Sequence, residues 1–235
     1  MSNNITDFSP FENALIDFWE GNQKKPLWLE SSLGTNDKMP VDIFFREEDE
    51  MPELELRALE LCRGKILDIG AGAGCHSLIL QERKKDVEAL EISKAFIEIL
   101  LLQGVQNIYH HDLFDFDSAK FDTLLVLMNG VGLAGTADNL PKFLNQLKKI
   151  LKPGGQVLID SSDIAYVYED EPLPKDTYYG EIKYRYSYKN KVGEWFNWLY
   201  LDKELLVTKA GEQGWKTEVI FEDEYDQFLC KMTLL

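Results

Sequence analysis

The chain has 235 residues, which is enough for one α/β domain with additions, and a formal net charge of −16. A negative field of this size repels phosphate backbones, so we expect no nucleic-acid partner. The three cysteines lack C-x-x-C or zinc spacing, no basic leader opens the chain, and no stretch approaches ~20 apolar residues. These features predict a cytoplasmic protein without a membrane span.

Residues 10–20 are predicted to form an amphipathic helix that begins at Pro10. The apolar side chains at helical spacing are Phe11, Ala14, Leu15, Phe18 and Trp19. Residues 21–40 are rich in turn-forming residues. Because so apolar a helix must cover another part of the molecule, we divide the chain into an N-terminal helical extension or cover, 1–51, and a main domain, 52–235.

The run from Lys65 to Cys75 is the most informative part of the sequence. Residues 65–68 read as a short buried strand ending in Asp68, and glycines follow at alternate positions 70, 72 and 74. Glycine lets the backbone turn sharply against a bulky ligand, and the start of the next helix offers free amides. The G-x-G-x-x-G spacing of dinucleotide sites is absent, because Cys75 occupies the position of its third glycine.

Predicted strands and helices alternate after this turn, as in a parallel sheet with right-handed crossovers. The predicted helices span 74–84, 94–103 and 139–151. The strands end in polar or glycine-flanked positions, which is typical of strand ends that border a ligand site. These strands are 86–91, ending in Glu91 before Ile92; 107–111, before Asp112 and Leu113; 121–130, ending in Met128, Asn129 and Gly130; and 156–160, ending in Asp160.

The pattern Asp-x-Gly-x-Gly-x-Gly, with these strand ends, resembles the class I S-adenosylmethionine-dependent methyltransferase family of the small-molecule type over roughly residues 52–162. The resemblance implies an α/β, Rossmann-like parallel sheet with a final antiparallel strand and helices on both faces. It also implies S-adenosyl-L-methionine as the cofactor. The cofactor-binding residues it assigns are Asp68, Gly70, Ala71, Gly72, Gly74, Glu91, Ile92, Asp112, Leu113, Met128 and Asn129.

Individual roles follow from the same resemblance. Glu91 would accept hydrogen bonds from the ribose hydroxyls, Ile92 would lie on the adenine face, and Asp112 would accept from the adenine amino group. Asn129 stands where the methyl group should be. The predicted catalytic residues are Asn129, Asp160 and His111. The candidate general bases are Asp160, Asp163, His111 and the tyrosines of the predicted hairpin. We predict no metal, because the family's metal pattern places an acid at the position of Asn129.

Residues 180–200 are predicted to form a β-hairpin inserted after the fifth strand. Its first strand alternates Ile182 and three tyrosines with polar residues, and its second strand is aromatic. A helix at 202–213 and a strand pair at 215–221 and 227–232 complete the chain. The aromatic face has two possible uses, a lid over the acceptor pocket or the interface of a homodimer.

The expected function is methyl transfer to a small-molecule acceptor, achieved mainly by proximity and orientation. The alternative is a non-catalytic S-adenosylmethionine-binding domain that acts through a protein partner. Under the first reading, the N-terminal helix and the hairpin together cover the ends of the parallel strands and wall the acceptor pocket.

Overall fold

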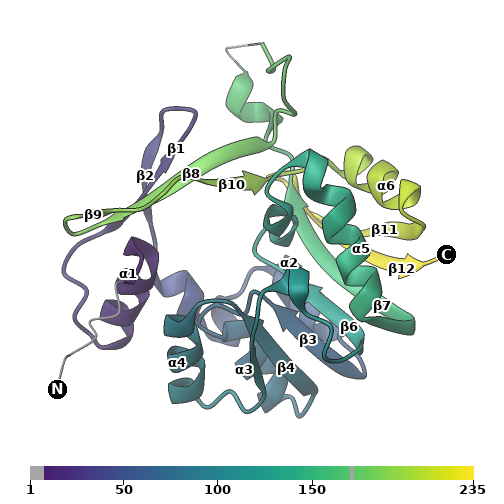
Figure 1. Cartoon of the computed structure of the whole chain (residues 1–235), viewed down its shortest axis with the longest axis horizontal. Coiled ribbons are helices and arrows are strands. Elements are labelled where there is room, and N and C mark those ends of the chain that lie inside the picture. Colours follow the sequence, from purple (N-terminus) through teal and green to yellow (C-terminus); the bar gives the residue numbers. More distant parts are fainter. Residues whose placement is uncertain (1–7, 170–171) are drawn as a thin grey trace.

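The computed structural model describes residues 8–169 and 172–235, and its main feature is a seven-stranded sheet (Figure 1). The strand order is β11-β12-β7-β6-β3-β4-β5. All neighbouring pairs from β7 to β5 are parallel, whereas β12 runs antiparallel to both β7 and β11. The strands are β3 (Lys65–Ile69), β4 (Asp86–Glu91), β5 (Ile108–His110), β6 (Phe121–Val126), β7 (Leu151–Ser162), β11 (Trp215–Glu222) and β12 (Gln227–Leu234). The predicted Rossmann-like sheet with a final antiparallel strand is confirmed.

Helices cover both faces of this sheet, as predicted. Because successive residues of a strand point to opposite faces, Ile66 and Leu67 of β3 enter different apolar clusters. Ile66 packs with α2 and α3, and Leu67 packs with α5 and α6. The helices are α2 (Glu53–Leu61), α3 (Cys75–Glu82), α4 (Lys94–Gln103), α5 (Leu140–Ile150) and α6 (Lys203–Glu212); short 3₁₀ turns are η1 (Asp42–Phe45), η2 (Glu48–Glu50), η3 (Leu113–Asp115), η4 (Gly130–Ala134), η5 (Ala137–Asn139) and η6 (Ala165–Tyr168).

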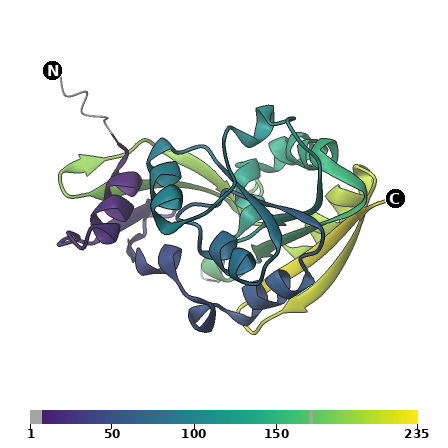
Figure 2. The same cartoon turned by 90° about the horizontal axis from the view of Figure 1, so that it is seen from below.

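A second sheet lies at the other end of the molecule from β11 and β12, as Figures 1 and 2 show. Its strand order is β10-β8-β1-β2, and β9 also pairs with β8. The predicted hairpin at 180–200 is present, since β10 pairs antiparallel with β8. The strands are β1 (Leu27–Ser31), β2 (Asn36–Met39), β8 (Glu181–Tyr188), β9 (Lys191–Val192) and β10 (Phe196–Leu199).

The hairpin of β1 and β2 corrects the sequence interpretation, which saw only a turn-rich segment at 21–40. Leu27 lies opposite Tyr188 in the pairing of β1 with β8, and both side chains are buried. The polar residues of β2 suit an edge strand, which natural sheets commonly protect with charge.

The predicted N-terminal helix is α1 (Pro10–Trp19), which begins with a capping box between Ser9 and Glu12. Ala14 and Leu15 of α1 are buried in one apolar cluster with Phe96 of α4 and Tyr188 of β8. The N-terminal segment thus packs on α4 of the main domain and also shares a sheet with the insertion. The boundary at residue 51 stays a prediction, and residues 1–7 lie outside the described part. No helix in the described ranges is both long and apolar enough to cross a membrane.

Candidate functional site

A cavity of about 1020 Å³ lies at the carboxyl ends of β3, β4, β5 and β6. On one side it is bounded by the loops that follow these strands. On the other it is bounded by a group of rings that we call the aromatic cover: Phe11, Phe44, Tyr184, Tyr186, Phe196, Trp198 and Tyr200. The N-terminal helix and the inserted hairpin therefore enclose the same cavity as the glycine turn.

The glycine turn after β3 lies along the floor of this cavity. Gly70 and Gly72 adopt φ values of +72° and +56°, which L side chains rarely adopt, and both line the cavity together with Ala71. Gly74 is not among the described lining residues. A Cβ there would lie 2.5 Å from Cδ2 of Leu100 in α4, so the predicted ligand contact of Gly74 is corrected to a packing role.

Glu91 ends β4 at the cavity wall and organises the turns around it. Its Oε2 accepts a hydrogen bond from the amide of Gly72 at 2.8 Å, and its Oε1 accepts from the amides of Ile92 and Ser93 at 2.8 and 2.7 Å. The side chain is buried, and burial raises the pKa of this carboxyl group despite the three amide donors. A carboxylate offers about four acceptor sites, so one remains for a ligand.

Ile92, Asp112 and Leu113 meet at one end of the cavity. Ile92 is 62% exposed although it is apolar, and it lines the cavity. Asp112 accepts from the amide of Phe114 at 2.8 Å through Oδ1. His111 also lines the cavity; its Nδ1 donates to the backbone oxygen of Asp112 at 2.9 Å, which leaves Nε2 of the neutral ring as an acceptor. An apolar platform beside a carboxylate suits a flat, amino-bearing ring.

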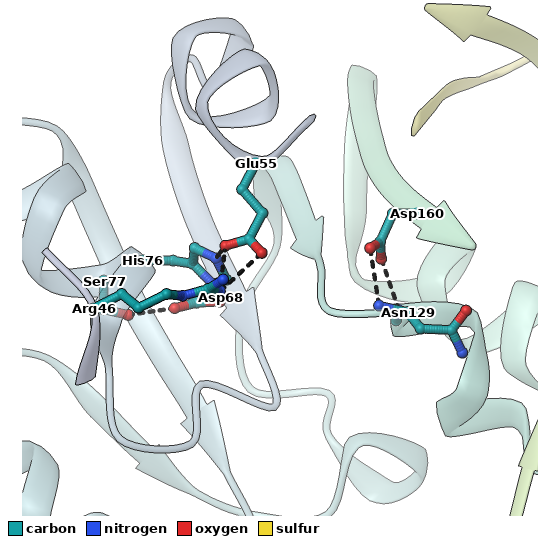
Figure 3. Close-up of polar contacts among 8 residues, drawn as sticks. Arg46, Glu55, Asp68, His76, Ser77, Asn129 and Asp160 are labelled. Atoms are coloured by element: carbon teal, nitrogen blue, oxygen red, sulfur yellow. Dashed lines mark hydrogen bonds and ion pairs between the residues drawn. The ribbon is translucent and has the colours of Figure 1, made fainter. Parts of the chain in front are cut away.

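The strand β6 ends at Val126, four residues before the predicted end, because the chain turns sharply at Met128 and Asn129. Both residues have left-handed φ values, 62° and 57°, and both line the cavity. Asp160 holds this turn: its two carboxylate oxygens accept from the amides of Asn129 and Gly130, each at 2.8 Å (Figure 3). Turns with a strained backbone that is held in place by surrounding residues are common at functional sites.

The geometry corrects the role expected for Asp160. Its carboxylate lies behind the turn and is absent from the described lining of the cavity. Burial raises its pKa to about 6, while the two amide donors oppose that shift. Asn129 does line the cavity, but its Nδ2 donates to the backbone oxygen of Leu199 at 3.0 Å and its Oδ1 accepts from Ser161 at 3.3 Å. Both residues therefore shape the turn that borders the site.

The side chains of Arg46, Glu55 and His76 form a charged network near the glycine turn (Figure 3). The sequence analysis did not predict this network. Nη2 of Arg46 donates to both oxygens of Glu55 at 2.8 and 2.9 Å, and Oε2 of Glu55 lies 2.6 Å from Nε2 of His76. His76 and Glu55 are each only 5% exposed, and His76 also lines the cavity. Asp68, the next-to-last residue of β3, lies beside these groups and accepts a hydrogen bond from the hydroxyl of Ser77 at 2.6 Å.

These charged groups shift one another's pKa values. Burial alone would lower the pKa of His76, but the hydrogen bond to Glu55 and the charge of Asp68 raise it. Burial opposes the ionised form of Glu55 as well, and His76 and Arg46 together still lower its pKa. Burial raises the pKa of Asp68 although His76 and Ser77 act in the opposite direction. His76 is therefore held toward its cationic form at the cavity wall.

Comparisons with known proteins were made for the whole chain. The sequence family described as a methyltransferase domain matches residues 67–159. No curated protein sequence matches the chain. Among solved structures, the chain is similar to a SAM-dependent methyltransferase from Bacteroides fragilis in complex with S-adenosyl-L-homocysteine, at 40% identity and a TM-score of 0.88. The match covers 96% of this chain and 94% of that one.

More distant structures share the fold. The methyltransferase CcbJ from Streptomyces caelestis is 12% identical with a TM-score of 0.63, and the match covers 81% of this chain and 99% of that chain. A S-adenosylmethionine-dependent methyltransferase from Clostridium acetobutylicum is 13% identical with a TM-score of 0.55, covering 77% and 87%. At these identities the likeness is one of fold.

Proposed function

Since the chain belongs to the SAM-dependent methyltransferases, we propose that it transfers a methyl group to a small-molecule acceptor held under the aromatic cover. The observation that carries this proposal is a single cavity of about 1020 Å³ bounded by the glycine turn on one side and by the cover on the other. Small-molecule sites have volumes of roughly 300–1,000 Å³, so a cofactor and a small acceptor together match this space.

The chain binds S-adenosylmethionine, and the residues present fit that cofactor. The glycine turn leaves backbone exposed to the ligand, and the exposed face of Ile92 suits adenine. Glu91, with one acceptor site free, is our proposed partner for a ribose hydroxyl, and Asp112 with Leu113 our proposed partners at the adenine edge. The cofactor carries a positive sulfur and an ammonium group, which the acids lining the cavity favour.

We assign the amino-acid end of the cofactor to Asp68 and His76. Asp68 offers a carboxylate oxygen to the ammonium group, while His76, whose pKa is raised by its pairing with Glu55, faces the carboxylate of the cofactor. His76 suits this task because Lys and Arg are absent from the described residues that line the cavity. The side chains of Glu55 and Arg46, which lie behind His76, then hold its imidazole ring in place and favour its charged form.

S-adenosylmethionine, when bound, supplies a methyl group activated by its positive sulfur. The protein's own contribution is orientation and exclusion of water. Asp160 fixes the strained turn at Met128 and Asn129, and that turn forms the wall where we place the transferred group. His111 stays our candidate base, since its Nε2 can accept a proton. Asp160 is not our candidate, because it is not among the described residues that line the cavity.

The rings of the aromatic cover line the cavity, which supports a role for the hairpin as a lid rather than as a homodimer interface.

The three cysteines are buried and unpaired within the described chain, which supports a cytoplasmic location.

Calorimetric titration with S-adenosyl-homocysteine and with NAD tests the cofactor assignment, and only the former should bind. Incubation with S-adenosylmethionine and a cell metabolite extract tests catalysis: a new methylated small molecule is expected, with release of S-adenosyl-homocysteine. Tight cofactor binding without any turnover in fractionated extracts would favour the non-catalytic alternative.

A further inference from the structure

We infer that the acceptor is an organic amine bearing an apolar or aromatic group, an inference that rests on the proposed methyl transfer. The observation behind it is the chemistry of the cavity half formed by the cover. That half combines many aromatic rings with two acids, Glu12 and Glu194, and the described residues lining the whole cavity include neither Lys nor Arg.

The cations of the second sheet are directed away from the cavity. Along β8, Tyr184 and Tyr186 line the cavity, whereas the alternate residue Arg185 pairs with Glu30 at 2.8 and 2.9 Å and stacks on Trp195 at 4.7 Å. An acceptor with a carboxylate or phosphate would therefore be enclosed without a counter-ion in this half. Enclosing an unpaired anion is costly, and this arrangement excludes acidic acceptors.

The rings of the cover form one continuous cluster at the cavity wall. Phe11 stacks on Tyr186 with centroids 4.6 Å apart, Tyr186 stacks on Phe196 at 5.4 Å, and Phe196 meets Trp198 edge-on at 6.3 Å. The faces of such rings attract ammonium groups and bury alkyl groups equally well. An amine uses both properties, whereas a neutral alcohol uses only the second.

Hydrogen-bond acceptors for an N–H group are also present. The hydroxyl of Tyr186 has no hydrogen-bond partner among the described residues, and the hydroxyls of Tyr184 and Tyr200 lie 3.3 Å apart. Burial raises the pKa of all three phenols, so they stay neutral and act as hydrogen-bonding groups rather than as bases. Glu194 is an exposed carboxylate at the edge of the cavity and can take a proton to solvent.

With an amine as the acceptor, methyl transfer begins with the loss of a proton from nitrogen. One N–H proton of the bound ammonium passes to the carboxylate of Glu194 and then to water, which frees the nitrogen lone pair. That lone pair forms the new nitrogen–carbon bond while the carbon–sulfur bond breaks and its electron pair stays on sulfur. The positive charge moves from sulfur to nitrogen, and the methylated product leaves as its ammonium ion with its remaining N–H protons.

Three probes with the same ring and different head groups test the inference: 2-phenylethylamine, 2-phenylethanol and phenylacetate. Each is titrated calorimetrically at pH 7 into the full chain saturated with S-adenosyl-homocysteine. We expect the amine to bind at least about tenfold more tightly than the alcohol, and phenylacetate to bind most weakly. Glu194→Gln should reduce amine binding severalfold and leave alcohol binding unchanged, while Glu218→Gln, an exposed acid on β11, should change neither.

The inference is overturned if phenylacetate or the alcohol binds as tightly as the amine, or if none of the three binds to the saturated protein. It is also overturned if Glu194→Gln lowers amine and alcohol binding equally. Saturation with S-adenosyl-homocysteine is measured first and separately. Its failure would count against the proposed function itself, so the two ideas fail in different experiments.

Discussion

Replacing Glu91 with alanine should affect both folding and cofactor binding, since this carboxylate serves the protein backbone as well as the cavity. Three amides, of Gly72, Ile92 and Ser93, donate to it at 2.7–2.8 Å. A variant without the side chain leaves these three donors to find other partners next to the ligand.

The magnitude follows from those contacts. A net hydrogen bond contributes about 1 kcal/mol, so three contribute about 3 kcal/mol; relief from burying a carboxylate reduces the loss to about 2–3 kcal/mol. For a chain of this size each kcal/mol lowers the Tm by about 2–4 °C, which predicts a fall of about 5–10 °C. The lost ribose contact should weaken S-adenosyl-homocysteine binding by a further factor of about 10.

Thermal unfolding of the apo protein and calorimetric titration of S-adenosyl-homocysteine measure the two effects separately. Glu88→Ala is the matched control, because Glu88 lies on the same strand, pairs with Lys65 at 2.9 Å and is not among the described lining residues. A partly exposed pair of this kind contributes about 0–1 kcal/mol. An unchanged Tm in the Glu91 variant would refute the backbone role, and a lower Tm with normal affinity would refute the ligand role.

Glu55→Gln should destabilise the fold by about 3–5 kcal/mol, since it leaves the buried His76 and the partly buried Arg46 without their counter-ion, and chemical denaturation measures this loss. Wild type should have a larger free energy of unfolding than His76→Gln, and this difference should be complete below about pH 6.5, the pKa of histidine in the unfolded chain. The difference should decline as the pH rises through the raised pKa of His76 in the folded protein. A difference that is flat from pH 5 to 9 would contradict the assigned ion pair. Gly132→Ala should lower stability by about 1–3 kcal/mol and abolish methyl transfer while cofactor affinity stays normal, because a Cβ there would lie 2.1 Å from Cε2 of Trp198 in the cover; a fully active variant would show that this packing is dispensable.

The central sheet could be predicted from the sequence because its signals are local. An apolar strand, an acid and three glycines fall within ten residues, and the later strand ends follow at regular intervals. The same local reading located the hairpin at 180–200. It could not find the pairing of β1 with β8, since the two strands are far apart in sequence and β1 carries no clear alternation.

Two buried acids near the cavity, Glu55 and Asp160, have partners that the sequence could not reveal. Glu55 looks like a surface residue of an amphipathic helix, and only its pairing with Arg46 and His76 explains its burial. Asp160 looks like a free carboxylate at a strand end, but the strained turn after β6 requires its two oxygens. In both cases the deciding partner comes from a distant segment, which no local pattern reveals.

The pairing of Leu27 with Tyr188 also sets an order of events during synthesis. All parallel strands of the central sheet have left the ribosome once Ser162 has emerged, which is before the hairpin has been made. The first strand to emerge, β1, must wait for β8 before it gains a neighbour on that edge. The strand ends that border the cofactor half of the cavity are therefore made before the hairpin that covers the acceptor half.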